Sequence, residues 1–180
     1  MARPGLRPLT VLDEPVADVY APHWSLEGGP EVPEADAPDE SVYLPGRNLL
    51  LAAKAAVWCR LRGVTSLALG GLASNPFADN TADFFDGLER VLDLALGGPI
   101  RLIRPYEGRS KVEVLCRGRE LRLPLDLTVS CLRPDQAGHP CGRCNKCAER
   151  SRAFAALARL DHPPEPPRVP SPRPRVPCTE

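Results

Sequence analysis

Four cysteines in the C-terminal part of the chain carry the clearest chemical signal in the sequence. Cys131, Cys141, Cys144 and Cys147 fall within 17 residues, and the last three have the spacing C-x2-C-x2-C. Two C-x2-C turns direct their sulfurs to one point, and a more distant cysteine completes a tetrahedron of soft ligands. Because no coordination position is then left for a substrate, we expect a structural metal ion, preferably zinc, that orders a loop poor in apolar residues.

Three other interpretations of these cysteines stay open on spacing alone: a disulfide pair, an iron–sulfur cluster, and four buried free thiols. C-x2-C repeats in a chain of intracellular character favour a metal over disulfides. His139 lies nearby in the sequence, but four thiolates already complete a tetrahedron, so we leave it out of the ligand set. Cys59 and Cys116 fall on expected apolar helix faces and are assigned to the core.

The overall composition limits the classes of function. Lys plus Arg and Asp plus Glu both number 23, so the formal net charge is zero, which argues against a broad electrostatic surface for nucleic acid. Residues 1–10 lack the apolar core of a signal peptide, and no stretch approaches the roughly 20 apolar residues of a membrane span. A reducing cytoplasm is therefore the expected compartment.

The prolines divide the chain unevenly. The sequence has 22 prolines, and eight of them lie in the last 18 residues. We therefore expect one domain over residues 8–162, large enough to bury a core, followed by a disordered proline-rich tail over residues 163–180.

The hydrophobic pattern predicts alternating strands and helices. The expected strands cover residues 9–12, 64–70 and 100–104, and the expected helices cover residues 49–62, 81–96, 110–116 and 145–160. The apolar run at 64–70 is bounded by glycines, as in a central strand of a parallel sheet. This order predicts an α/β fold with a parallel sheet, in which ligands bind beyond the carboxyl ends of the strands.

The loops that follow Leu12, Gly70 and Arg104 are therefore the expected walls of a ligand site. In the second helix, Val91 is expected to face the core together with its phenylalanine and leucine neighbours. Residues 20–40 contain prolines, glycines and acidic residues, and we expect a solvated loop in which Trp24 alone packs.

Five short motifs occur in an order that resembles a known family. They are Leu44-Pro45-Gly46-Arg47-Asn48 (V-P-G-R-N in the family), Asp79–Phe84 (D-C-x-P-E-F), Ser110–Val114 (T/S-K-x-E-I), Leu127–Cys131 (L-T-W-S-C) and Cys141–Arg150 (C-G-x-C-x-x-C-x-x-R). Over about residues 9–161 the chain resembles the 7-cyano-7-deazaguanine synthase family, of the PP-loop ATP pyrophosphatase superfamily. The resemblance implies a Rossmann-like parallel sheet of the PP-loop (adenine nucleotide α-hydrolase) type, here N-terminally incomplete, with a C-terminal zinc-bound loop and helix.

The resemblance also implies an activity. The family uses ATP with Mg²⁺ to convert 7-carboxy-7-deazaguanine and ammonia into a nitrile, the precursor of queuosine-type tRNA bases, and a homo-oligomer is expected. By resemblance, Arg47 and Asn48 face the nucleotide or the deazaguanine, and Asn75 and Asp79 lie beside the substrate. Lys111 meets phosphate as a point charge, the four cysteines hold zinc, and no catalytic residue is assigned.

One family motif has no counterpart in this sequence. The superfamily's S-G-G-x-D-S turn cradles pyrophosphate and helps to hold Mg²⁺. The segment Leu69–Ser74 is similar in outline, but Leu69 replaces the first serine and Ala73 replaces the aspartate. We expect the first strands of the family fold to lie outside this chain, either because its start is misassigned or because a second chain supplies them. Without those strands, the remaining sheet would have an exposed edge, and the chain alone would be inactive.

Two alternatives stay open beside an enzyme. The first is a non-catalytic relative that binds a deazapurine through the same pocket. The second is a zinc-ribbon-like nucleic-acid module that uses the basic residues around the cysteines, namely Arg143, Lys146, Arg150 and Arg152. The zero net charge and the lack of interleaved aromatic residues favour solvated helix charges over the second alternative.

Overall fold

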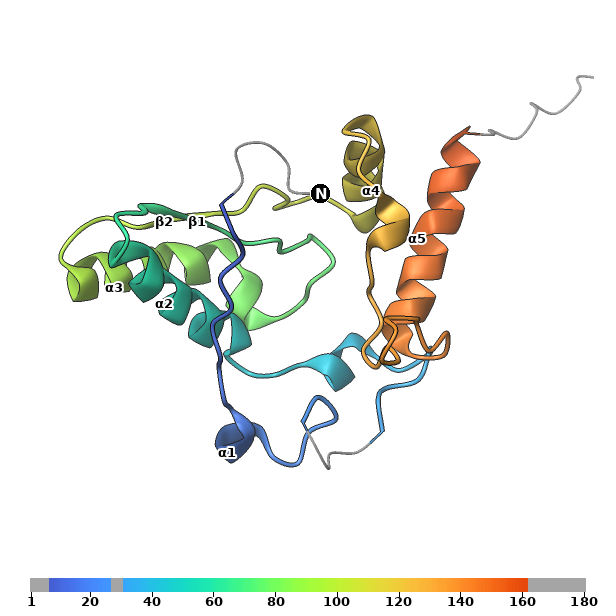
Figure 1. The fold of residues 1–180 in the computed structure, drawn as a ribbon, viewed down its shortest axis with the longest axis horizontal. Coiled ribbons are helices and arrows are strands. Elements are labelled where there is room, and N and C mark those ends of the chain that lie inside the picture. Colours follow the sequence, from blue (N-terminus) through green and yellow to red (C-terminus); the bar gives the residue numbers. More distant parts are fainter. Residues whose placement is uncertain (1–6, 27–30, 162–180) are drawn as a thin grey trace, which may run out of the picture.

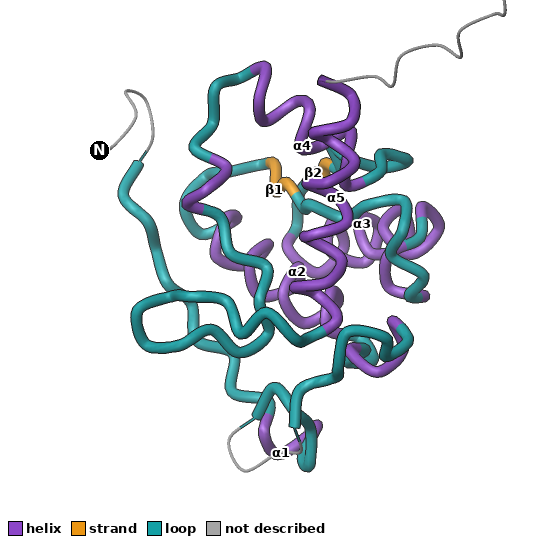
Figure 2. Tube along the Cα trace, turned by 90° about the vertical axis from the view of Figure 1, so that its right-hand side faces the viewer, coloured by secondary structure: helices purple, strands orange, loops and turns teal. Residues whose placement is uncertain are grey.

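The computed structural model describes residues 7–26 and 31–161, so the expected tail over 163–180 lies outside the described residues (Figure 1). The helices are α1 (Ala17–Tyr20), α2 (Arg47–Arg60), α3 (Ala82–Leu96), α4 (Lys111–Glu120) and α5 (Asn145–Asp161), and the strands are β1 (Ser66–Ala68) and β2 (Arg101–Ile103). Short 3-10 turns cover Asp39–Val42, Ala78–Asn80 and Leu125–Leu127. The tube view shows how short the strands are beside the helices, and α1 lies at the lower edge in both views (Figures 1 and 2).

The predicted parallel β-α-β unit is present. β1 and β2 pair in parallel, with Leu67 opposite Leu102, and α3 connects them. Figure 1 shows α2 and α3 on the same side of this small sheet. The fold is therefore α/β, with a parallel sheet of two strands in the part of the chain that the structure describes.

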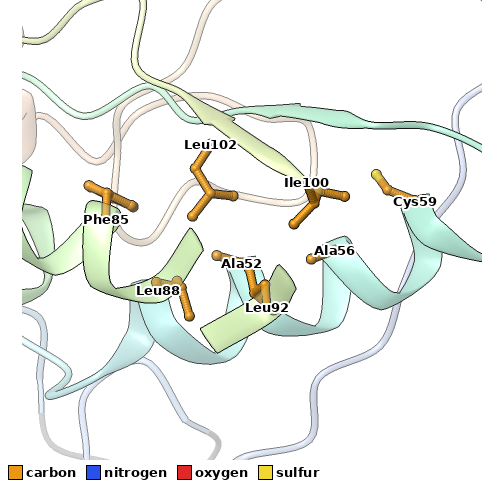
Figure 3. Close-up of a cluster of buried hydrophobic side chains, with 8 residues drawn as sticks. All are labelled: Ala52, Ala56, Cys59, Phe85, Leu88, Leu92, Ile100 and Leu102. Atoms are coloured by element: carbon orange, nitrogen blue, oxygen red, sulfur yellow. The ribbon is translucent and has the colours of Figure 1, made fainter. Parts of the chain in front are cut away.

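The main core fills the space between the sheet and these two helices (Figure 3). Its buried members are Ala52, Ala56, Cys59, Phe85, Leu88, Leu92, Ile100 and Leu102. The two alanines of α2 lack bulk, so the helix can lie close to the strands, while leucines of α3 supply the apolar volume. Burial of each large aliphatic side chain contributes about 1.5–3 kcal/mol.

The other face of the sheet is open among the described residues. Ser66, Ala68, Arg101 and Ile103 alternate with the core residues and are exposed. β1 also pairs along one edge only. The strand expected at the centre of the sheet therefore lies at its edge among the described residues. The apolar run at 64–70 nevertheless has the character of a strand covered on both faces.

The prediction of a buried strand at residues 9–12 is wrong. This segment has no ladder partner, and Leu9 and Val11 are 90% and 77% exposed. A short β-prone run forms a strand only where a neighbouring strand accepts its backbone hydrogen bonds. Instead, Lys54 of α2 holds the following residues through the carbonyl of Asp13 and the carboxylate of Glu14.

Two helix details also differ from expectation. Val91, expected to face the core, is 60% exposed because Leu88 and Leu92 already fill the buried face of α3. α4 continues past its expected end at 116 through Gly118. That glycine is buried against Leu125, and a Cβ at position 118 would lie 2.9 Å from a methyl carbon of Leu125.

The start of α4 yields a stability prediction. Ser110 Oγ accepts the Glu113 N–H at 3.3 Å, and the Glu113 carboxylate accepts the Ser110 N–H at 2.8 Å. Ser110→Ala removes half of this capping box and is expected to lower the free energy of unfolding by about 1 kcal/mol. Urea unfolding at pH 7 measures this, with the exposed mid-helix Ser151→Ala as a near-neutral control; equal effects of the two changes would contradict the assignment.

The same cap predicts a pH dependence. The Ser110 backbone N–H, followed by Arg109, lowers the pKa of Glu113 from 4.5 to about 2. Because the folded pKa is depressed, the stabilisation is present above about pH 4.5 and is lost as the pH falls through about 2. Glu113→Gln should lack this component in acid unfolding curves, and an unchanged curve would show that the cap does not contribute.

Candidate metal centre and ligand cavity

The four predicted cysteines converge. Their sulfur atoms all lie within 4.8 Å of one another, and the Sγ atoms of Cys141 and Cys147 are 3.9 Å apart. A tetrahedral thiolate site with metal–sulfur bonds of about 2.3 Å places its sulfurs about 3.8 Å apart. No disulfide forms among the cysteines of the described residues, so the disulfide interpretation is contradicted there. The donor set fits a tetrahedral metal ion.

Backbone N–H groups donate to two of the four sulfurs, those of Cys131 and Cys141. The Arg133 and Cys141 N–H groups donate to the Cys131 sulfur at 3.3 and 3.2 Å. Backbone N–H groups of Arg143 and Cys144 lower the pKa of Cys141 to about 6, whereas burial raises the pKa of Cys147 to about 12. A cation bound between them is what would hold both groups as thiolates.

A distant N-terminal segment covers the cysteine cluster. Val32 is 5% exposed and packs on Cys144 and Cys147, and Glu34 forms an antiparallel bridge with Cys144. The Asn145 N–H donates to the Pro33 carbonyl at 3.1 Å. The expectation of a solvated loop is therefore wrong for this part of residues 20–40, because the apolar side of the cluster needs a cover.

Trp24 packs as predicted. It contacts the same cluster together with Leu132, and its indole N–H donates to the Ser41 carbonyl at 3.1 Å. This bond satisfies the one polar atom of the ring. The indole is thus a fixed apolar wall beside the cysteines.

A cavity of about 400 Å³ lies beside the cluster. Its walls come from Trp24, the segment 35–42, the loop after β1, Lys111 of α4 and the first turns of α5. This volume is within the range of small-molecule sites. The loop after Gly70 therefore lines the cavity as predicted. The loops after Leu12 and Arg104 do not line it. Tyr106, in the loop after Arg104, borders two separate pockets.

The cavity carries an excess of positive charge. Four cationic side chains (Arg47, Lys111, Lys146 and Arg152) and two carboxylates (Asp39 and Glu149) line it, so two positive charges are uncompensated. The guanidinium groups of Arg47 and Arg152 have no ion-pair or hydrogen-bond partner among the described residues. Unpaired guanidinium groups beside a cavity favour an anionic ligand, which they can bind through two parallel hydrogen bonds.

The two lysines of the cavity share a carboxylate. Lys111 and Lys146 lie 2.8 and 3.0 Å from Glu149, and Lys146 also lies 2.9 Å from Asp39. Burial alone would raise the pKa of Glu149, but the hydrogen bonds from both lysines outweigh it and lower that pKa. Glu149 therefore stays ionised and fixes α4 against α5.

The structure divides the residues assigned by resemblance into two groups. Arg47, Asn75 and Lys111 line the cavity, and Asn75 also accepts the Phe77 N–H at 3.1 Å. Asn48 and Asp79 bond to each other instead: Asp79 accepts the Asn48 backbone N–H at 2.9 Å, and the Asn48 amide donates to the Asp79 carbonyl at 2.9 Å. Asp79, 6% exposed, thereby anchors its loop to the start of α2.

Sequence reasoning missed two cavity residues on α5. Glu149 was visible only as a spacer in the cysteine motif, and its pairing with Lys111 depends on the packing of α4 against α5. Asn145 occupies a spacer position between Cys144 and Cys147. It is 5% exposed, and neither polar atom of its side chain has a hydrogen-bond partner in the described part of the chain; no sequence pattern signals this.

Comparison with known proteins decides the family. Residues 22–158 match the family model described as Queuosine biosynthesis protein QueC. The chain belongs to this family.

The QueC relatives include proteins named 7-cyano-7-deazaguanine synthase. The one from Thiobacillus denitrificans is 32% identical over 139 residues, which is 73% of this chain and 61% of the relative. The one from Methanothermobacter thermautotrophicus is 30% identical over 151 residues, 78% of this chain and 67% of the relative. The chain thus spans about three fifths of the length of the curated relatives it matches.

The resemblance read from the motifs is confirmed by this family match. The family also supports the PP-loop type for the observed α/β fold. Within residues 7–26 and 31–161, no helix combines the length and the apolar character needed to cross a bilayer.

The cysteine geometry predicts a metal ion in the purified protein. We expect one ion per chain, measured by inductively coupled plasma mass spectrometry, and loss of most of it in Cys144→Ser because a buried ligand is removed. Cys116→Ser, a half-buried cysteine outside the cluster, is the matched control. Full metal content in Cys144→Ser would contradict a site built from the four cysteines.

Proposed function

We propose that this chain provides the zinc-bound, substrate-binding part of a 7-cyano-7-deazaguanine synthase. The reaction joins 7-carboxy-7-deazaguanine and ammonia at the expense of ATP to give 7-cyano-7-deazaguanine for queuosine-type tRNA bases. The observation that carries the proposal is the cavity beside the cysteine cluster, where unpaired arginines and an aromatic wall meet residues of the family motifs.

The cavity suits a flat, negatively charged heterocycle. Trp24 and the backbone of Gly70 and Gly71 supply apolar or side-chain-free walls for a ring. Arg47 and Arg152 supply the counter-charge for its carboxylate. Binding in this way holds the carboxylate in place for reaction.

The reaction needs two activations, the first of the carboxylate and the second of the amide. A carboxylate oxygen attacks the α-phosphorus of ATP and releases pyrophosphate, and ammonia then displaces AMP to give the amide and a proton. A second adenylation, now of the amide oxygen, makes that oxygen a leaving group, and its departure as part of AMP, with loss of the two amide protons, leaves the nitrile. Lys111, at the cavity wall, is placed to neutralise phosphate oxygens during these steps.

In this proposal the metal is zinc and its role is structural. Four thiolates fill the tetrahedron, so no position is open for substrate or water. Zinc would act by holding the cover segment at Val32 to Glu34 and the start of α5 in one arrangement.

The phosphate-binding loop and its Mg²⁺ would come from polypeptide outside these 180 residues. The S-G-G-x-D-S motif does not occur in the sequence, and Leu69 and Ala73 cannot replace its serine and aspartate. The open edge of β1 is where a further strand would pair, and the exposed outer face of the sheet is where a further helix would pack. The chain alone would then bind the substrate without converting it.

The two alternatives differ in support. A deazapurine-binding protein without catalysis would use the same cavity, and it would differ from the enzyme only in lacking a phosphate-binding loop. A nucleic-acid module is less well supported, because Arg150 donates internally to Thr128 and to the Leu125 carbonyl, at 2.8 and 2.9 Å, and Lys146 is paired with Asp39 and Glu149.

Titration calorimetry with 7-carboxy-7-deazaguanine tests the binding site. We expect saturable binding by the metal-loaded chain, and a loss of about tenfold or more in affinity for Arg152→Ala, since a hydrogen bond between charged groups is removed. Arg159→Ala, an exposed arginine on the same helix, is the control and should bind as the unmodified chain does. Absence of binding by the unmodified chain would overturn the proposed function.

A turnover assay tests the phosphate-loop argument. With ATP, Mg²⁺, ammonia and 7-carboxy-7-deazaguanine, the 180-residue chain should form no nitrile detectable by mass spectrometry. Multiple turnovers by the chain alone would show that its own residues bind the phosphates, and would refute that part of the proposal.

A further inference from the structure

We propose that Asn145 reads the hydrogen-bonding edge of the bound heterocycle and so determines which ring the cavity accepts. The inference rests on the proposed function, because it concerns the same cavity. It assigns to a spacer residue of the cysteine motif a role in specificity that metal binding does not require.

The side chain of Asn145 is in an unusual state. The residue is 5% exposed and lines the cavity, yet neither its amide nitrogen nor its carbonyl oxygen has a hydrogen-bond partner among the residues that the structure describes. A buried polar group without a partner costs about 1–3 kcal/mol. The described residues around Asn145 offer it no partner, and the cavity that it lines is the place from which a ligand could supply one.

The backbone at this position is held firmly. The Asn145 N–H donates to the Pro33 carbonyl at 3.1 Å, and Cys144 and Cys147 on either side belong to the cluster. The residue is also the first of α5. Its backbone is therefore fixed beside the cavity by the same contacts that hold the cysteines.

The face of α5 that meets the cavity has a polar group at each end. Asn145, Glu149 and Arg152 recur at helical spacing on that face. Asn145 and Arg152 are separated by about 10 Å along the helix axis. A carboxylate held by the arginine would leave the far edge of a bicyclic ring directed toward the carboxamide.

The chemistry of that edge matches a carboxamide. Asparagine offers one acceptor oxygen and two donor hydrogens side by side. The edge of a deazaguanine opposite its 7-carboxylate offers the 2-amino donor beside the acceptor N3, so the two groups can form paired hydrogen bonds. A site built around such pairs rejects an analogue of the same shape that lacks them.

Asn145→Leu separates recognition from structure. Leucine has a similar volume and removes both unpaired polar atoms, so the variant should melt no lower than the unmodified protein and keep its metal. If Asn145 instead supports the fold, the variant will lose thermal stability and metal content. Gln136→Leu, which replaces an exposed carboxamide in the same cysteine loop, is the matched control.

The binding test compares two ligands by calorimetry. 7-Carboxy-7-deazaguanine has this donor–acceptor edge, and indole-3-carboxylate has a similar bicyclic shape and carboxylate without it. The unmodified chain should bind 7-carboxy-7-deazaguanine more tightly than indole-3-carboxylate. In the Asn145→Leu variant this preference should fall by about tenfold or more, while the affinity of the variant for indole-3-carboxylate should not fall.

The outcomes distinguish the two proposals. Binding of 7-carboxy-7-deazaguanine with an unchanged ligand preference in Asn145→Leu would mean that the amide is merely hydrated, and would overturn this inference while leaving the proposed function intact. A variant with lost metal or stability would also overturn it. Failure of the unmodified chain to bind 7-carboxy-7-deazaguanine would overturn both.

Discussion

The arrangement of this protein depends on the convergence of four cysteine sulfurs at one point. That convergence joins Cys131 to the start of α5, and the cluster is covered by Val32 from more than a hundred residues earlier in the chain. Neither the cysteine loop nor the segment around Val32 has enough apolar side chains to pack by itself. A metal ion between the thiolates would supply the missing free energy, and the cavity forms where the two segments meet.

Electrostatics at this junction explains why the cavity is both rigid and cationic. Glu149 holds Lys111 of α4 and Lys146 of α5, so two helices are joined through one carboxylate. The guanidinium groups of Arg47 and Arg152 have no partner within residues 7–26 and 31–161 and are available to a ligand. Lys146 is thus a structural cation and the two arginines face the cavity unpaired, whereas Lys111 both joins the two helices and borders the cavity.

The sequence predicted those features that depend on local chemistry. The spacing of Cys141, Cys144 and Cys147 was sufficient for the cluster, and the capping residue Ser110 was sufficient for the start of α4. Features that depend on distant partners were not predictable. Residues 9–12 have strand-like side chains but no strand beside them, and Asn145 looks like an ordinary spacer until Pro33 and the cavity wall are placed around it.

The central claim is that the metal-bound cluster holds the cavity together. Hydrogen–deuterium exchange of the metal-loaded and chelator-treated protein tests it directly. The account predicts faster exchange in residues 31–42 and 131–150 after metal removal, with α2 and α3 unchanged because their core lies apart from the cluster. Unchanged exchange in residues 31–42, or an equal loss of protection throughout the chain, would contradict it.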